Sequence, residues 1–212
     1  MATAKELLHE ARVNITLALD RLENEQLPRL DTSRRVLPVP YSSQHEVDAK
    51  RFSLDCGAAC VEMIGEYYRP EKNGVIGTNE IHDWMTGGRN KTTSKDELQR
   101  ALAHFYDVQV DAHYDVTPAN LRGWIDNGHP AIVLVRYGDF PLRMDLSYTS
   151  GHWMCVVGYD SFDWSGNEVK RLIMHDPDWY AQHMAQGGFL PVIEEMFVGM
   201  HSDYRRLALV AG

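Results

Sequence analysis

A helical pattern begins abruptly at Cys56, after the polar and irregular stretch 44–55. Apolar side chains then recur at the spacings of one, three and four residues that define one face of an α-helix, at Ala59, Cys60, Met63, Ile64 and Tyr67. The pattern places Cys56 at a helix N-terminus, where the macrodipole and unpaired N–H groups favour an anion. Such a position favours the thiolate, the nucleophilic form of cysteine. The alternative is a buried, inert thiol, because a lone cysteine needs a histidine nearby to act.

A second pair of candidate groups lies at the ends of two strand-like runs. His152 precedes the apolar run 153–159, and Asp176 follows the run 169–174, where Pro177 prevents the strand from continuing. If these strands pair antiparallel, His152 and Asp176 lie at neighbouring ends. A carboxylate there would fix the tautomer of the histidine and stabilise its cationic form. The alternatives are a solvated histidine at a strand end and an ordinary turn aspartate before proline.

Four separated segments match, in order, the pattern of an enzyme family; they are residues 39–44, 55–60, 151–160 and 176–177. Over residues 36–210 the chain thereby resembles the double-glycine (bacteriocin-leader) peptidase-like branch of the papain-like cysteine peptidases. The resemblance implies an α+β fold, with the cysteine on a helical lobe packed against an antiparallel sheet that carries the histidine and aspartate. It implies that Gln44 is the oxyanion-hole residue, Cys56 the nucleophile, His152 the general base and Asp176 the orienting residue.

These residues predict a cysteine hydrolase that cleaves peptide or isopeptide bonds through an acyl-enzyme on Cys56. Gln44 and the backbone N–H of Cys56 would stabilise the oxyanion. Transfer of the acyl group to an amine and deamidation of glutamine are alternatives with the same site, because only the acceptor or the bond attacked differs. A catalytically silent peptide-binding or assembly module is an alternative of another class, and the presence of all four site residues counts against it.

Charge and histidine spacing indicate which partners to expect. The net charge is −9, and basic residues cluster in nothing larger than adjacent pairs such as Arg34-Arg35 and Arg205-Arg206, which argues against nucleic acid or an anionic membrane as a partner. The ten histidines include no His-x-x-x-His pair, and there is no Cys-x-x-Cys pair. We therefore expect a peptide or protein substrate and no metal or cofactor. Metal binding by His152, His175 and Asp176 is the less favoured alternative to the triad.

Two further expectations come from the cysteines and from the N-terminus. Cys60 and Cys155 lie in apolar surroundings and are predicted to be core thiols rather than a disulfide. The chain begins without a basic start followed by an apolar run, and it has no apolar stretch long enough to span a membrane. The default location is therefore cytoplasmic, with release by lysis or by signal-independent secretion as alternatives.

An amphipathic helix is predicted over residues 4–27, with apolar residues three and four apart, and residues 28–35 are polar like a linker. We divide the chain into residues 1–30, an N-terminal helix and linker, and residues 31–212, the peptidase domain. The helix could dock on its own domain or on a neighbouring chain, giving a homo-oligomer or a bound protein partner.

The remaining patterns predict an edge strand over 37–41, helices over 78–85, 94–106 and 117–127, strands over 108–113, 131–136 and 206–210, and a short helix within 188–200. A capping box starts the helix at Ser94. The aromatic loop 137–148 and Trp179 are placed near the cleft, either as covers of the site or as ordinary surface and core residues.

Overall fold

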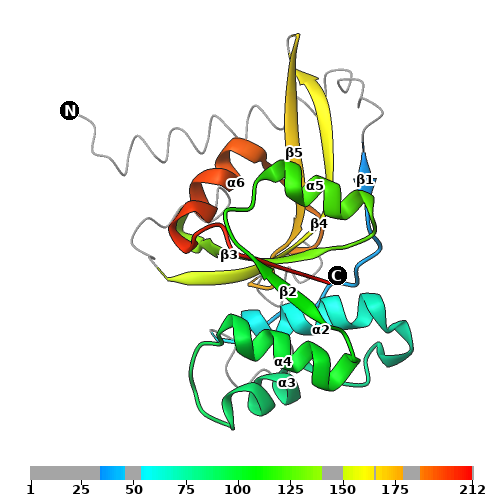
Figure 1. Cartoon of the computed structure of the whole chain (residues 1–212), viewed down its shortest axis with the longest axis vertical. Coiled ribbons are helices and arrows are strands. Elements are labelled where there is room, and N and C mark those ends of the chain that lie inside the picture. The colour runs from blue at the N-terminus through cyan, green and yellow to red at the C-terminus, as the bar shows by residue number, and fades with distance from the viewer. Residues whose placement is uncertain (1–33, 46–53, 140–149, 165, 179–186, 212) are drawn as a thin grey trace, which may run out of the picture.

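The computed structural model describes residues 34–45, 54–139, 150–164, 166–178 and 187–211. The fold is α+β, as predicted, with a lobe of three helices packed against an antiparallel sheet (Figure 1). The lobe consists of α2 (Cys56–Tyr68), α3 (Thr78–Thr86) and α4 (Lys95–Tyr106). Two further helices, α5 (Pro118–Asp126) and α6 (Glu194–His201), lie on the other side of the sheet from this lobe (Figure 1).

The sheet has seven strands in the order β2-β7-β3-β4-β5-β6, and β1 also pairs with β4. The strands are β1 (Arg35–Val36), β2 (Val110–His113), β3 (Ala131–Arg136), β4 (Gly151–Trp164), β5 (Asn167–His175), β6 (Leu190–Ile193) and β7 (Ala208–Ala211). β4 and β5 form a long antiparallel hairpin in which Cys155 pairs with His175. Because β4 starts where β5 ends, His152 and Asp176 lie at the same end of these two paired strands.

Side chains of β4 alternate between two cores, as the twofold period of a strand requires. Cys155 and Val157 pack on the face covered by α2 and α4, while Met154 and Val156 pack on the face covered by α6. The strand that carries His152 is thus held from both sides, which fixes the direction of that side chain.

Local sequence signals set the helix starts. The predicted capping box is confirmed: Ser94 Oγ accepts from the Glu97 N–H at 3.4 Å, and the Glu97 carboxylate accepts from the Ser94 N–H at 2.8 Å. Thr117 and Asn120 form a second box at the start of α5. The helix α2 begins at Cys56, as the pattern predicted, without a side-chain cap from Asp55.

The structure differs from the predicted elements in three respects. The edge strand expected over 37–41 is wrong: the strand is β1. The N–H of Leu37 still donates to the carbonyl of Val157 in β4 at 2.8 Å, but residues 38–41 leave the sheet because Pro38 and Pro40 have no N–H to donate. Arg35, assigned to the linker, lies in β1. The strand β6 was not predicted, since it is short and contains Pro191, a residue confined to edge strands. The predicted helix over 4–27 and Trp179 lie outside the described residues.

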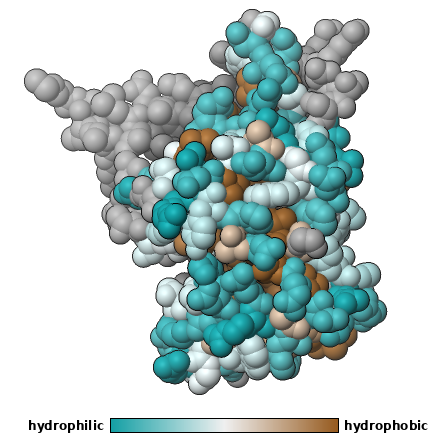
Figure 2. All heavy atoms as spheres, in the orientation of Figure 1, coloured by the Kyte–Doolittle hydropathy of each residue, from teal (hydrophilic) through white to brown (hydrophobic). Residues whose placement is uncertain are grey.

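Within the described ranges, no helix combines the length and the apolar character needed to cross a bilayer. The face seen in Figure 2 is mainly hydrophilic over the helical lobe, and apolar side chains show between that lobe and the sheet.

A glycine allows the helix that carries Cys56 to approach α4 closely. A Cβ on Gly65 would lie 2.2 Å from the ring of Tyr106, which is fully buried and cannot easily move. We expect Gly65→Ala to lower the free energy of unfolding by about 1–3 kcal/mol, measured by urea denaturation. Gly123→Ala is the matched control, because a Cβ there meets nothing within 4 Å and the residue lies in α5. Equal stability of the two variants would contradict this account of the packing.

Candidate active site

The irregular segment 41–45 is tied to the end of β5 by hydrogen bonds across the chain. The hydroxyl of Tyr41 donates to the carbonyl of Asp176 at 2.9 Å. The carbonyl of Pro177 accepts from the backbone N–H of Gln44 at 2.9 Å and from the hydroxyl of Ser43 at 3.2 Å. These contacts bring the predicted oxyanion residue next to the predicted orienting carboxylate, although the two are far apart in sequence.

Cys56 stands apart from the other two cysteines. It opens α2 and is partly exposed, whereas Cys60 and Cys155 are fully buried. All three thiols are free, which confirms the prediction of core thiols at Cys60 and Cys155. Burial raises the pKa of the Cys60 thiol well above its usual value. Reagents in solution can therefore reach Cys56 far more easily than its two neighbours.

His152 and Asp176 form a buried pair. The Nε2 atom of His152 lies 2.8 Å from Oδ1 of Asp176, and the side chains are 5% and 0% exposed. Because a carboxylate only accepts, Nε2 carries the hydrogen. The imidazole also interacts with the Cys56 side chain. Burial lowers the pKa of His152, but the bond to Asp176 and the contact with Cys56 outweigh it and raise the pKa to about 10.

Two more donors hold the Asp176 carboxylate. The backbone N–H of Asp178 donates to Oδ1 at 2.9 Å, and the Tyr137 hydroxyl donates to Oδ2 at 2.8 Å. The ring of Tyr137 also stacks on the imidazole of His152, with centroids 4.0 Å apart and planes inclined by 29°. From the sequence, Tyr137 was expected only in a loop near the cleft. Its place directly after β3, which pairs with the first residues of β4, was the signal that could have linked it to His152.

Gln44 is buried, and its side chain contacts Asp178. The Nε2 group donates to Oδ1 of Asp178 at 2.8 Å, and the same oxygen lies 2.6 Å from Nε2 of His45. The amide oxygen of Gln44 is buried without a hydrogen-bond partner among the described residues. Asp178 was not among the predicted site residues, because it lies in a segment without periodicity, two residues after Asp176.

His175 lies beside Asp176 in sequence but is engaged elsewhere. Its Nε2 donates to the carbonyl of Val39 at 3.0 Å, and its Nδ1 accepts from the N–H of Phe189 at 2.9 Å. Burial lowers the pKa of His175 to about 4, so the ring is neutral at physiological pH. In the part of the chain that the structure describes, no three His, Cys, Asp or Glu side chains gather as a metal site would require.

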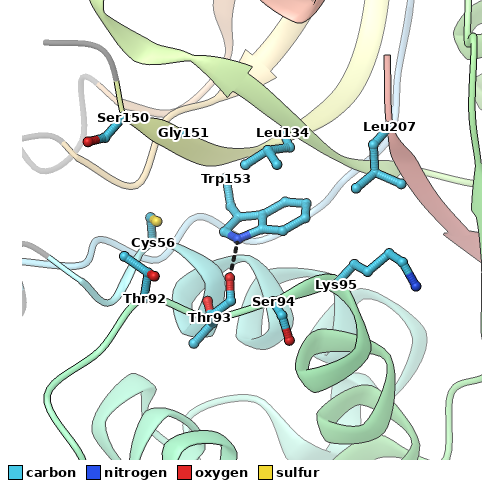
Figure 3. A pocket seen from close by; sticks show the side chains of 10 residues that line it. All are labelled: Cys56, Thr92, Thr93, Ser94, Lys95, Leu134, Ser150, Gly151, Trp153 and Leu207. Atoms are coloured by element: carbon cyan, nitrogen blue, oxygen red, sulfur yellow. Dashed lines mark hydrogen bonds between the residues drawn. The ribbon is translucent and has the colours of Figure 1, made fainter. Parts of the chain in front are cut away.

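A cavity of about 470 Å³ opens beside Cys56 (Figure 3). Its walls are Cys56, Thr92, Thr93, Ser94, Lys95, Leu134, Ser150, Gly151, Trp153 and Leu207. The indole N–H of Trp153 donates to the carbonyl of Thr93 at 3.2 Å, which fixes the ring as one wall. In Figure 3, Cys56 and Ser150 lie on one side of this ring and Lys95 and Leu207 on the other.

Comparison with known proteins assigns the chain to a family. Residues 36–190 match the Peptidase_C39 like family. The chain belongs to this C39-like peptidase family. Among curated proteins, no sequence matches the chain. The matched range contains Gln44, Cys56, His152 and Asp176.

Solved structures show the same fold at low sequence identity. A protein described as a C39-like peptidase from Bacillus anthracis aligns with a TM-score of 0.59 and 11% identity, covering 85% of this C39-like chain and 98% of its own. UfSP from C. elegans aligns with a TM-score of 0.53 and 12% identity, covering 90% of this chain but 35% of its own. The papain-like cysteine-peptidase fold predicted from the sequence is confirmed.

Proposed function

We propose that this protein is a cysteine hydrolase that cleaves peptide or isopeptide bonds through an acyl-enzyme on Cys56. The observation that carries the proposal is the placement of His152, which contacts the partly exposed thiol of Cys56 and lies 2.8 Å from the buried carboxylate of Asp176. A nucleophile, a base and a group that orients the base are the parts that nucleophilic catalysis needs.

The tautomer of His152 decides which ring nitrogen exchanges protons with Cys56 and the substrate. Since Nε2–H is held by Asp176, Nδ1 is the atom that exchanges a proton with the thiol. The Cys56 sulfur attacks the substrate carbonyl carbon, and the oxyanion is stabilised by the Gln44 amide and the backbone N–H of Cys56. The C–N bond breaks as Nδ1–H protonates the leaving amine. Water then attacks the thioester and gives one proton to Nδ1; the C–S bond breaks, the sulfur leaves as the thiolate, and the carboxylic acid is released.

Electrostatics support this sequence of steps. With a pKa of about 10, His152 keeps its proton at neutral pH despite its burial. The imidazolium is a cation beside Cys56 and stabilises the thiolate. The acid that protonates the leaving amine would therefore already be in place before the attack.

The cavity beside Cys56 suggests where the acyl part of the substrate binds. Its lining includes Cys56 but not His152 or Asp176. Because His152 has to protonate the leaving amine, the leaving group lies at the imidazole and the acyl chain extends into the cavity. Leu134, Trp153 and Leu207 give apolar walls, and Lys95 at the rim is paired with Asp96. We propose an uncharged, apolar side chain on the acyl side, because burying a charge there would cost free energy.

The test is labelling with a cysteine-directed acyl-type probe, followed by cleavage of a peptide library. The expected result is labelling of Cys56 alone, and kcat/KM at least about tenfold higher for Leu or Phe than for Gly at the preferred acyl-side position. A site that neither takes the probe nor cleaves any peptide would refute the hydrolase. Cleavage without such a preference would refute only the assignment of the cavity.

Tyr137→Phe tests the support of the His152–Asp176 pair. Phenylalanine keeps the ring against the imidazole but removes the donor to Oδ2 of Asp176. We expect kcat to fall by about tenfold, because a buried carboxylate loses one of its hydrogen bonds, a loss worth about 1.5–3 kcal/mol for a charged group. The measurement is kcat on the best library peptide. Tyr114→Phe is the control, since Tyr114 is an exposed tyrosine, and an equal kcat in both variants would contradict the role.

A further inference from the structure

The carboxylate of Asp178 contacts both Gln44, the proposed oxyanion donor, and the neighbouring residue His45. Oδ1 of Asp178 accepts from Nε2 of Gln44 at 2.8 Å and lies 2.6 Å from Nε2 of His45. The side chains of His45 and Asp178 are 10% and 15% exposed, and Gln44 is 3% exposed. The amide of Gln44 is therefore held in a nearly closed polar cluster.

The orientation of this amide matters because its two ends have opposite roles. The NH2 end has two hydrogens, and the other end is an acceptor that would repel a substrate oxyanion. A carboxylate only accepts, so Asp178 binds the NH2 end and disfavours the flipped amide. One hydrogen of the NH2 group is used by Asp178, and the other remains for the substrate. The oxygen end has no hydrogen-bond partner among the described residues, so it contributes nothing to this choice.

We infer that Asp178 is a positioning residue that fixes the orientation of the Gln44 amide toward the oxyanion; the inference rests on the function proposed above. Asp178 acts through Gln44 and does not touch the substrate. His45 also contributes, because the negative charge of the Asp178 carboxylate would repel a nearby oxyanion. A hydrogen bond from His45 to the same carboxylate oxygen reduces this repulsion.

Asp178 also touches the other half of the site, but through its backbone. Its N–H donates to Oδ1 of Asp176 at 2.9 Å. Asp178→Ala keeps this N–H and removes only the carboxylate. The variant therefore separates an effect on the oxyanion donor from an effect on the His152–Asp176 pair.

The experiment is a double-mutant cycle on acylation by p-nitrophenyl acetate, with Cys56→Ala as the background rate. Gln44→Ala is expected to slow the release of p-nitrophenol by about a hundredfold, as for other oxyanion donors. Asp178→Ala should slow it by about tenfold or more, and the double variant should be no slower than Gln44→Ala alone. The pH dependence of acylation should keep the wild-type midpoints in Asp178→Ala, because His152 and Asp176 retain their contacts.

Several outcomes would overturn the inference. They are wild-type acylation by Asp178→Ala, losses that multiply in the double variant, or a shifted pH midpoint, which would place the effect in Asp176. If Asp178→Ala does not fold, Asp178→Asn serves in the cycle, because its amide keeps an acceptor but tolerates both orientations of Gln44, and an intermediate loss is expected. If wild type and Cys56→Ala release p-nitrophenol equally, the proposed function itself fails. The two failures are thus distinguishable.

Discussion

Cys56→Ala is expected to abolish turnover, lowering kcat by about four orders of magnitude or more, as loss of a catalytic nucleophile does in other hydrolases. The variant should stay folded, because Cys56 is partly exposed at the first residue of α2 and only packs against the margin of the core, so that losing the sulfur opens no buried cavity. Peptide cleavage and thermal unfolding of the two proteins give both quantities. Residual cleavage close to the wild-type rate would remove Cys56 from the mechanism.

Alkylation provides an independent check on the same residue. Iodoacetamide at neutral pH should modify Cys56 first, since Cys60 and Cys155 are fully buried and burial raises the pKa of Cys60. Mass spectrometry of the digested protein measures the three sites separately. The control is the same reaction in denaturant, where all three thiols should react alike. Similar rates in the folded protein would count against an activated thiol at position 56.

Asp176→Ala is expected to lower kcat by about three orders of magnitude, because a group that orients a catalytic base contributes on that scale. The substitution leaves His152 Nε2–H, the Tyr137 hydroxyl and the Asp178 N–H without their common acceptor. Asp111→Ala, an exposed aspartate in β2, is the matched control and should keep wild-type turnover. Loss of activity in both variants would point to general damage rather than to the site.

Asp176→Asn separates the charge of this side chain from its shape. An asparagine oxygen can still accept from His152, but the negative charge that helps to raise the pKa of His152 to about 10 is lost. The pKa of His152 should fall, so the imidazolium loses its proton at a lower pH. The high-pH limb of the rate profile should therefore shift to lower pH. A limb that stays in place would show that the charge of Asp176 does not control the protonation of His152.

The sequence predicted those parts of the site that depend on local signals. The helical period placed Cys56 at the start of α2, and the run before Pro177 placed Asp176 just past the end of β5. The pairing of two neighbouring strands then followed from their proximity in the chain. The catalytic roles of Gln44, Cys56, His152 and Asp176 stay predictions until the variants are measured.

The contacts that sequence reasoning missed are those set by irregular backbone and by strand register. Tyr137 reaches His152 because Arg136 pairs with Gly151, and a register shift of one residue would turn the facing side chains away. Asp178 and Gln44 lie in two segments without periodicity, so no sequence pattern predicts the contact between them. The prolines at 38 and 40 likewise gave the sequence an extended pattern, but a proline has no N–H to donate to a neighbouring strand.

The hydrogen bonds between segment 41–45 and residues 176–178 also set the order in which the protein can become active during synthesis. Gln44 and Asp178 are separated by 134 residues, and His152 and Asp176 by 24. Contacts of such long separation form late, because the loop between them must close first. A ribosome-bound chain that already exposes Cys56 would lack the partners that orient His152 and Gln44 until residues 176–178 have emerged. The thiol would therefore have no oriented base until the sheet is complete, and it would not act on the nascent chain that carries it.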